Sequence, residues 1–177
     1  MGGQIVDRRA LPAGYRIEPL ASNHDRAAFC CGNPELDAYI RQQAGQDQKR
    51  KLAAVFILIA DSGAVAGFHT LSAHSILAVN LPAEMAKKLP RYLIPVTLLG
   101  RMAVSQALQG LGLGELLLMD ALERAWMASR HAASWAVVVN TKAGAREFYL
   151  KHGFVPFPDQ PGRLGLQMKT IELMSQA

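Results

Sequence analysis

A chain of 177 residues, half of them hydrophobic, fits one folded domain better than two and is too apolar for a disordered protein. Its 19 lysines and arginines exceed its 14 acidic residues, and the net charge of +5 favours a polyanionic partner such as a nucleic acid or a phosphate-bearing ligand, with a soluble domain that has a basic face as the alternative. Adjacent Cys30 and Cys31 argue against a secreted disulfide framework, Met1–Ala10 is no signal peptide, and the longest apolar run, Leu52–Ala60, is too short for a membrane span, so we expect a cytoplasmic protein without membrane attachment.

The first half of the chain predicts a strand, a helix and a hairpin. Asn33-Pro34-Glu35 has the features of a helix start, because asparagine caps N–H groups, proline suits the first helical position and an acid suits the first turn. Apolar spacing then predicts one buried helical face. The strands expected in this half are Tyr15–Leu20, Leu52–Ala60 and Ala64–Ile76, the last two joined by a tight turn at 61–63.

The second half alternates strands with helices after a proline-broken connection at Leu77–Tyr92, where we expect a loop with a short helix. The elements expected after it are strands at Val96–Val104, Trp135–Val139 and Leu164–Ile171 and helices at Leu113–Ser129 and Ala143–Lys151. This order predicts an α/β fold with a mixed, mostly antiparallel central sheet flanked by helices. We expect one domain over residues 1–177, with residues 1–14 as a loose N-terminal segment.

The densest glycine cluster lies between a predicted strand and a predicted helix, at Gln109-Gly110-Leu111-Gly112-Leu113-Gly114. A helix N-terminus offers unpaired N–H groups and the positive end of the helix dipole, so this loop can bind a phosphate through its backbone. The P-loop is excluded because no Gly-Lys-Ser/Thr follows, and the dinucleotide fingerprint is excluded because Glu115 stands where its third glycine belongs. A tight strand–helix connection without a ligand is the alternative.

The spacing Gln109-x-x-Gly112-x-Gly114 resembles the acetyl-CoA pyrophosphate loop of the GNAT superfamily of acetyltransferases. Further along, Phe148-Tyr149-Leu150-Lys151-His152-Gly153-Phe154 resembles that superfamily's late aromatic element, whose tyrosine hydroxyl faces the thioester sulfur. The resemblance implies acetyl-CoA as co-substrate and Tyr149 as the catalytic residue. It also implies a set of cofactor-binding residues: Met102, Ala103, Val104, Gln109, Gly110, Leu111, Gly112, Leu113, Gly114, Asn140 and Phe148.

A narrower resemblance covers nearly the whole chain. It is carried by four segments in order: Cys31–Asp37, Gln46-Asp47, Leu89–Pro95 and Leu98–Val104. Together they look like the GNAT toxins of bacterial type II toxin–antitoxin modules, the TacT, AtaT and KacT group. This resemblance implies acetylation of the α-amino group of aminoacyl-tRNA, which blocks translation, together with a ribbon-helix-helix antitoxin as partner and a homodimeric assembly.

The chemistry of the groups favours an α-amine acceptor. An α-amino group ordinarily has a pKa of about 7.7 and is partly neutral near pH 7, whereas a lysine amine at about 10.4 needs a strong base, and the motifs contain no obvious Glu or His base. Tyr149 can donate a hydrogen bond to the departing sulfur, and the backbone N–H of Met102 or Val104 can polarise the thioester oxygen. The five histidines lack metal-ligand spacing, so we expect no metal.

Basic clusters and one tyrosine are the candidate tRNA contacts, although each cluster alone is more often a solvated face. These residues are Lys49, Arg50, Lys51, Lys87, Lys88, Arg91, Tyr92, Lys142 and Arg146. The main alternative is a GNAT enzyme that acetylates a small amine or a protein N-terminus, which would not need a basic surface. The second is a degenerate domain that only binds a partner, and an intact loop with Tyr149 argues against it.

Overall fold

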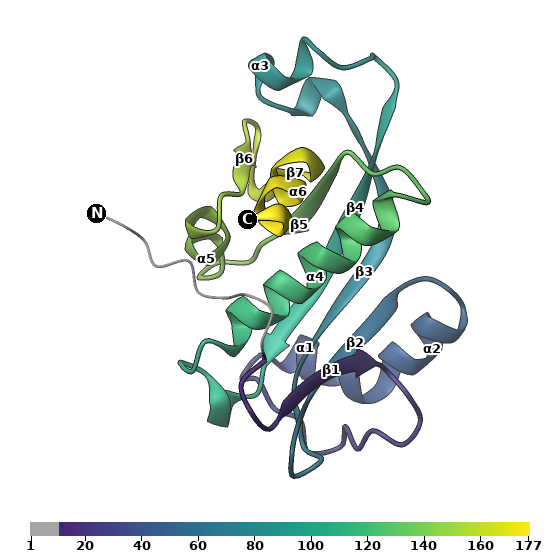
Figure 1. The fold of residues 1–177 in the computed structure, drawn as a ribbon, viewed down its shortest axis with the longest axis vertical. Helices are drawn as coiled ribbons and strands as arrows, with labels where there is room; N and C mark the ends of the chain where they lie inside the picture. Colours follow the sequence, from purple (N-terminus) through teal and green to yellow (C-terminus); the bar gives the residue numbers. More distant parts are fainter. Residues whose placement is uncertain (1–10) are drawn as a thin grey trace. The chain divides into compact units, whose positions relative to one another are not determined.

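The computed structural model describes residues 11–177, and most of the expected 1–14 segment lies outside the described residues. Seven strands form one sheet in the order β1-β2-β3-β4-β5-β7-β6 (Figure 1). Their bounds are β1 Tyr15–Pro19, β2 Ala54–Ala60, β3 Val65–Leu77, β4 Leu93–Val104, β5 Ala136–Asn140, β6 Val155–Phe157 and β7 Gln160–Gln167. The helices are α1 Pro34–Ala38, α2 Ala44–Lys49, α3 Ala83–Ala86, α4 Leu113–Ser129, α5 Arg146–Lys151 and α6 Met168–Gln176.

The pairing is mixed, which confirms the predicted α/β fold. Strand β4 runs parallel to β5, with Thr97–Leu99 opposite Val137–Val139. The pairs β1–β2, β5–β7 and β6–β7 are antiparallel. A parallel pair needs a crossover connection, and α4 lies in the connection between β4 and β5.

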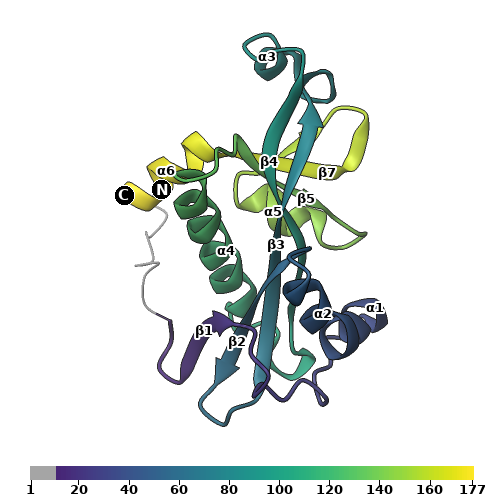
Figure 2. The same cartoon turned by 90° about the vertical axis from the view of Figure 1, so that its right-hand side faces the viewer.

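The chain divides into two compact units. The first contains the residues up to Thr70 and Arg101–Ala121. Its core includes Ile40, Ile57, Ile59 and Phe68, each at most 1% exposed. The predicted cap is present, because the Asn33 side-chain oxygen accepts hydrogen bonds from Glu35 and Leu36 N–H at 3.0 and 3.4 Å. The π-helical turn Tyr39–Gln43 follows α1 directly and leads directly into α2, so the three segments are consecutive helical turns (Figure 2).

The second unit contains Leu71–Gly100 and Leu122–Ala177. Its core gathers Ile94, Val96, Ala136, Val138 and Phe157. The connection at Leu77–Tyr92 is a loop with a short 3₁₀ turn and α3, as expected. Helix α6 packs on β5 and β7 (Figure 1).

Several strand bounds differ from the predictions, since β2 begins at Ala54, β4 at Leu93 and β7 at Gln160. The last strand ends at Gln167, and Met168–Gln176 is helical, so the predicted strand Leu164–Ile171 is wrong in its final part. Buried Leu164, Leu166 and Met168 follow the alternating pattern of a strand, whereas Met168 and Ile171 share a helical face. Because Met168 fits both patterns, the sequence does not show where the strand ends and the helix begins.

Two further differences have local causes. The three-residue strand β6 is missing from the sequence prediction, because it contains a proline and is too short to give a periodic signal. Helix α5 begins at Arg146 instead of Ala143, because Gly144 takes a left-handed φ of 92° that interrupts right-handed helix geometry.

Candidate functional site

The glycine loop between β4 and α4 presents a helix N-terminus. Gly110 and Gly112 have left-handed φ values of 83° and 81°, which explains why glycine stands at both positions. The Gly112 carbonyl accepts the Leu116 N–H at 3.3 Å, so Gly112 is the N-cap of the 17-residue helix α4. The N–H groups of Leu113 and Gly114 therefore point out of the first turn, at the positive end of the helix dipole. This arrangement fits a pyrophosphate.

The side chains of this loop mostly anchor it. Leu113 is 2% exposed and sits in a core cluster, whereas Leu111 is 65% exposed. The Gln109 side-chain amide donates to the carbonyls of Cys31 and Val104 at 2.9 and 3.0 Å. Gln109 thus connects three of the first unit's segments, and any contact with a phosphate at this loop falls to the backbone.

The C-terminal part of β4 carries Met102, Ala103 and Val104, the residues expected to contact the pantetheine arm. Gly67 on β3 allows close packing here, because a Cβ on it would lie 2.7 Å from the Ala103 carbonyl oxygen. The Arg101 guanidinium lies 3.8 Å above the ring of buried Tyr39. Burial raises the pKa of Tyr39 to about 12.

Tyr149 lies on α5 and is 8% exposed. Its ring meets those of Phe148 and Phe154 edge to face, at centroid distances of 5.2 and 5.3 Å. This apolar surrounding disfavours the phenolate, and burial raises the Tyr149 pKa to about 12. The side chain is therefore a neutral phenol at neutral pH and can donate a hydrogen bond.

Asn140 ends strand β5 with an exposed side chain. Its Oδ1 accepts a hydrogen bond from Arg163 Nε at 3.0 Å. Because the oxygen is used in this way, the amide NH₂ group is the part of Asn140 left to donate to a ligand. No signal in the sequence points to Arg163, since it is distant in the chain from Asn140 and belongs to no motif.

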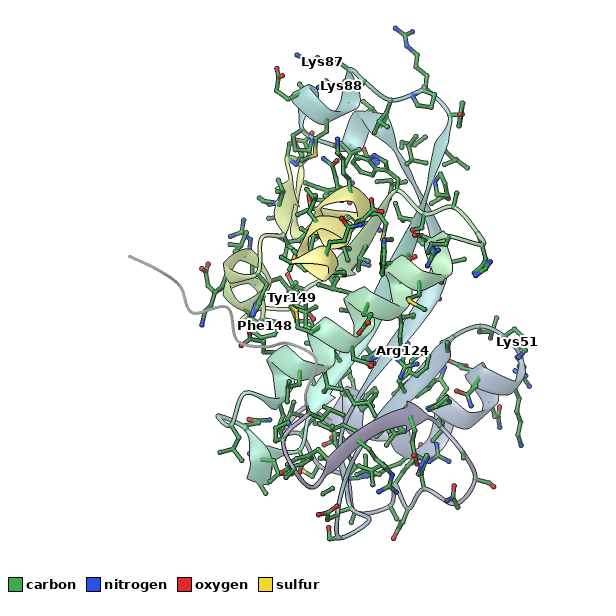
Figure 3. The ribbon with its side chains drawn as sticks, viewed as in Figure 1. Lys51, Lys87, Lys88, Arg124, Phe148 and Tyr149 are labelled. Carbon is green, nitrogen blue, oxygen red and sulfur yellow. The ribbon has the colours of Figure 1, made fainter. Side chains whose placement is uncertain are left out.

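The basic candidates lie in both units. Lys49, Arg50 and Lys51 form the end of α2 and the residues after it in the first unit. In the second unit, Lys87 and Lys88 follow α3 (Figure 3), and Tyr92 is 69% exposed. Lys87 pairs with Glu84 at 2.7 Å, and Arg146 Nε donates to the Pro161 carbonyl at 3.1 Å. Arg91 and Lys142 are exposed.

Two buried histidines are paired with carboxylates. His69 Nε2 lies 2.6 Å from Asp120 Oδ2, and His24 Nε2 lies 2.6 Å from Glu18 Oε1. The Ala21 N–H donates to His24 Nδ1, so the proton of a neutral His24 ring is on Nε2 and points to Glu18. Both histidines therefore have structural roles. Within residues 11–177 we find no helix that is long and apolar enough to cross a membrane.

The sequence matches the profile of the acetyltransferase (GNAT) domain over residues 52–156. A tRNA-acetylating toxin of Mycobacterium tuberculosis is 34% identical over 159 residues, which are 89% of this chain and 95% of the toxin. The probable toxin TacT of Sinorhizobium fredii is 32% identical over 166 residues, 88% of this chain and 92% of that protein.

Solved structures of similar fold include the AtaT toxin in two complexes. AtaT with acetyl-methionyl-tRNAfMet has a TM-score of 0.85 and 28% identity, and the match covers 91% of this chain and 99% of AtaT. A tyrosine-to-phenylalanine mutant of AtaT, bound to the C-terminus of the antitoxin AtaR and to acetyl-CoA, has a TM-score of 0.80 and 25% identity. That match covers 93% of this chain and 99% of the mutant.

Proposed function

The chain belongs to the GNAT acetyltransferase family, and we propose that it is an acetyl-CoA-dependent toxin that acetylates the α-amino group of aminoacyl-tRNA and so blocks translation. The observation that supports this proposal most is its similarity to a tRNA-acetylating toxin along nearly the full length of both chains. The basic balance of the sequence agrees with a tRNA substrate. Acetylated aminoacyl-tRNA has no free α-amine to serve as nucleophile in peptide-bond formation.

In this proposal the glycine loop holds acetyl-CoA by its pyrophosphate. The first-turn N–H groups of Leu113 and Gly114 supply donors, while Gly110 and Gly112 supply the left-handed turns that expose them. Backbone groups of Met102 to Val104 and the NH₂ group of Asn140 are assigned to the pantetheine arm. When bound, acetyl-CoA supplies the activated acetyl group.

We assign to Tyr149 the stabilisation of the thiolate that departs from the thioester. The C–N bond forms between the acceptor amine and the acetyl carbon as the C–S bond breaks, so negative charge develops on sulfur. A phenol with a pKa of about 12 keeps its proton and stabilises that charge by a hydrogen bond, and the amine's released proton is available for the sulfur later. An α-amine with a pKa of about 7.7 needs no strong base.

The remaining proposals concern the partners, the tRNA contacts and the place of action. AtaT is described with the antitoxin AtaR and with tRNA, and we propose an antitoxin of ribbon-helix-helix type and a homodimer for this protein as well. Lys49, Arg50, Lys51, Lys87, Lys88, Arg91, Tyr92, Lys142 and Arg146 are the candidate tRNA contacts. Since charged tRNA is a cytoplasmic substrate, we propose the cytoplasm as the site of action.

The direct test is incubation of the purified protein with isotope-labelled acetyl-CoA and a pool of aminoacylated tRNA. Ribonuclease digestion and mass spectrometry should then reveal an acetyl group on the α-amine of aminoacyl-adenosine, with uncharged tRNA as the control. Labelling of free polyamines or of peptide N-termini, with unmodified aminoacyl-adenosine, would instead support the alternative acceptors.

A further inference from the structure

A buried carboxylate is connected to the glycine loop through a single intervening residue, Cys31. Asp37 on α1 is 7% exposed, and its Oδ1 accepts the Cys31 N–H at 2.7 Å. Burial by itself would raise the Asp37 pKa, but the hydrogen bond from the Cys31 backbone and weaker contacts outweigh it and lower the pKa. Asp37 is therefore ionised at neutral pH and accepts this hydrogen bond as an anion, which makes the bond a strong one.

The other side of the same backbone segment holds the loop. The Cys31 carbonyl accepts the Gln109 side-chain amide at 2.9 Å, and the Cys30 carbonyl accepts the Gln106 N–H at 2.8 Å. Gln109 also reaches back to the Val104 carbonyl at 3.0 Å. A continuous set of hydrogen bonds thus leads from Asp37 through Cys31 to Gln109.

The Cys31 thiol donates to the Asn33 carbonyl at 3.7 Å and also interacts with the Asp37 carboxylate. Burial, and secondarily Asp37, raise the Cys31 pKa to about 11, so the thiol stays protonated. The link from Asp37 to Gln109 runs through the backbone of Cys31, with its N–H bonded to Asp37 and its carbonyl bonded to Gln109.

The crest of the loop, which we define as Gly110 to Gly112, has little packing of its own. Cβ atoms placed on Gly110 or Gly112 would have no heavy atom within 4 Å. Leu113 anchors one end of the loop in the core, and the hydrogen bonds of Gln109 hold the other end. Without those bonds, the glycine crest would sample many backbone conformations, since glycine has the fewest steric restrictions.

We propose that Gln109 and Asp37 are positioning residues for acetyl-CoA, acting on the phosphate-binding backbone through Cys31 instead of contacting the cofactor themselves. This inference rests on the proposed role of the loop. It predicts that the two side chains control cofactor affinity and leave the chemical step at saturating cofactor nearly unchanged.

The main variant is Gln109→Glu, which keeps the shape of the side chain and removes the donor. A carboxylate would face two carbonyl oxygens, and we expect the Kd for coenzyme A by calorimetry and the KM for acetyl-CoA to rise about tenfold, with kcat within about twofold. Gln109 is exposed, so the variant should fold, and its melting temperature checks this. The matched control is Gln106→Glu, which adds the same charge nearby but leaves the Gln106 backbone bond to Cys30 intact.

Asp37 is tested by a pair of variants. Asp37→Asn retains an oxygen that can accept the Cys31 N–H, and we expect cofactor affinity within about threefold of the wild type. Asp37→Leu removes the acceptor and should weaken coenzyme A binding about tenfold. An equal loss of coenzyme A affinity in both variants would show that the hydrogen bond from the Cys31 N–H does not control cofactor binding. This result would overturn the role of Asp37.

Gly112→Val separates this inference from the proposed function. Normal binding by Gln109→Glu, or an equal loss in Gln106→Glu, would overturn the positioning role even if Gly112→Val binds poorly. Normal binding by Gly112→Val as well would remove the loop from the cofactor site, and the proposed pyrophosphate contact would fail together with the inference.

Discussion

The loop at 106–114 and the helix α5 are two candidate functional elements built on different physical principles. The loop uses main-chain N–H groups, and its side chains face carbonyls, core or solvent. Helix α5 presents one side chain, the Tyr149 phenol, and surrounds it with aromatic rings that keep it neutral.

We expect the two elements to contribute to different steps, the loop to cofactor binding and Tyr149 to catalytic turnover. A backbone site depends on conformation, so it is damaged by any residue that cannot adopt a left-handed φ. A side-chain site depends on one functional group and tolerates any change that preserves it. Substitutions in the loop should therefore alter cofactor affinity, and substitution at Tyr149 should alter the rate of acetyl transfer.

The largest effect is expected for Tyr149→Phe. The ring and its packing remain, while the hydrogen bond to the departing sulfur is lost, so kcat should fall about 10²–10³-fold with acetyl-CoA affinity nearly unchanged. Steady-state kinetics and calorimetry on the same preparation test both parts. A fully active Tyr149→Phe enzyme would falsify the role assigned to the hydroxyl and point to another donor.

The raised pKa of Tyr149 adds a pH-dependent expectation. The phenol loses its proton only as pH rises through its folded-state pKa of about 12, instead of its ordinary value near 10. The wild-type kcat should accordingly show no loss from Tyr149 ionisation up to about pH 10. An alkaline decline that begins lower and disappears in Tyr149→Phe would contradict this assignment.

Gly112→Val should produce the next largest effect. Valine is strained at a φ of 81°, so the N-cap must rearrange and the Kd for acetyl-CoA should rise at least about tenfold, while kcat at saturation changes little. Gly63→Val is a matched control, because Gly63 has a φ of 84° and a Cβ added to it would meet no heavy atom within 4 Å, but it lies in the turn between β2 and β3. Equal binding losses in both variants would indicate general destabilisation.

A smaller effect is expected from the basic residues. If Lys49 and Arg50 contact tRNA phosphates, each alanine substitution should reduce the slope of log K against log salt by about one. Binding of aminoacylated tRNA measured over a range of salt concentrations checks this. A slope that both substitutions leave unchanged would place the tRNA contacts elsewhere and favour the cations of the second unit.

The smallest effect concerns stability in acid. The Asp37 pKa is lower in the folded state than in the unfolded state, so its ionised form stabilises the fold above its unfolded pKa of about 3.9. That contribution is lost as pH falls through the folded pKa. Thermal unfolding should therefore show the wild type losing more stability than Asp37→Asn as pH is lowered below about 4. Parallel curves would mean that the Asp37 charge contributes nothing.

Much of the fold is readable from local patterns. The Asn33 cap, the bounds of α4 and the hairpin of β2 and β3 follow from capping chemistry, helical periodicity and a glycine turn, all of which act within a few residues. The boundary between β7 and α6 cannot be predicted in this way, because Met168 satisfies both the strand pattern and the helix pattern.

The sequence by itself determined which residues are candidates for chemistry. A glycine loop before a helix and an aromatic pair before Gly153 are local signals, since they depend on backbone freedom and on neighbouring side chains. Only the tertiary structure decided what surrounds them. The hydrogen bonds from Gln109 to Cys31 and from Arg163 to Asn140 join segments far apart in the chain, and a contact of that kind leaves no periodicity or propensity in the sequence on either side. The burial of Asp37 could not be predicted from the sequence either, because a carboxylate beside an apolar helical face is usually solvated. In this fold the Cys31 N–H and neighbouring groups make burial of the anion favourable.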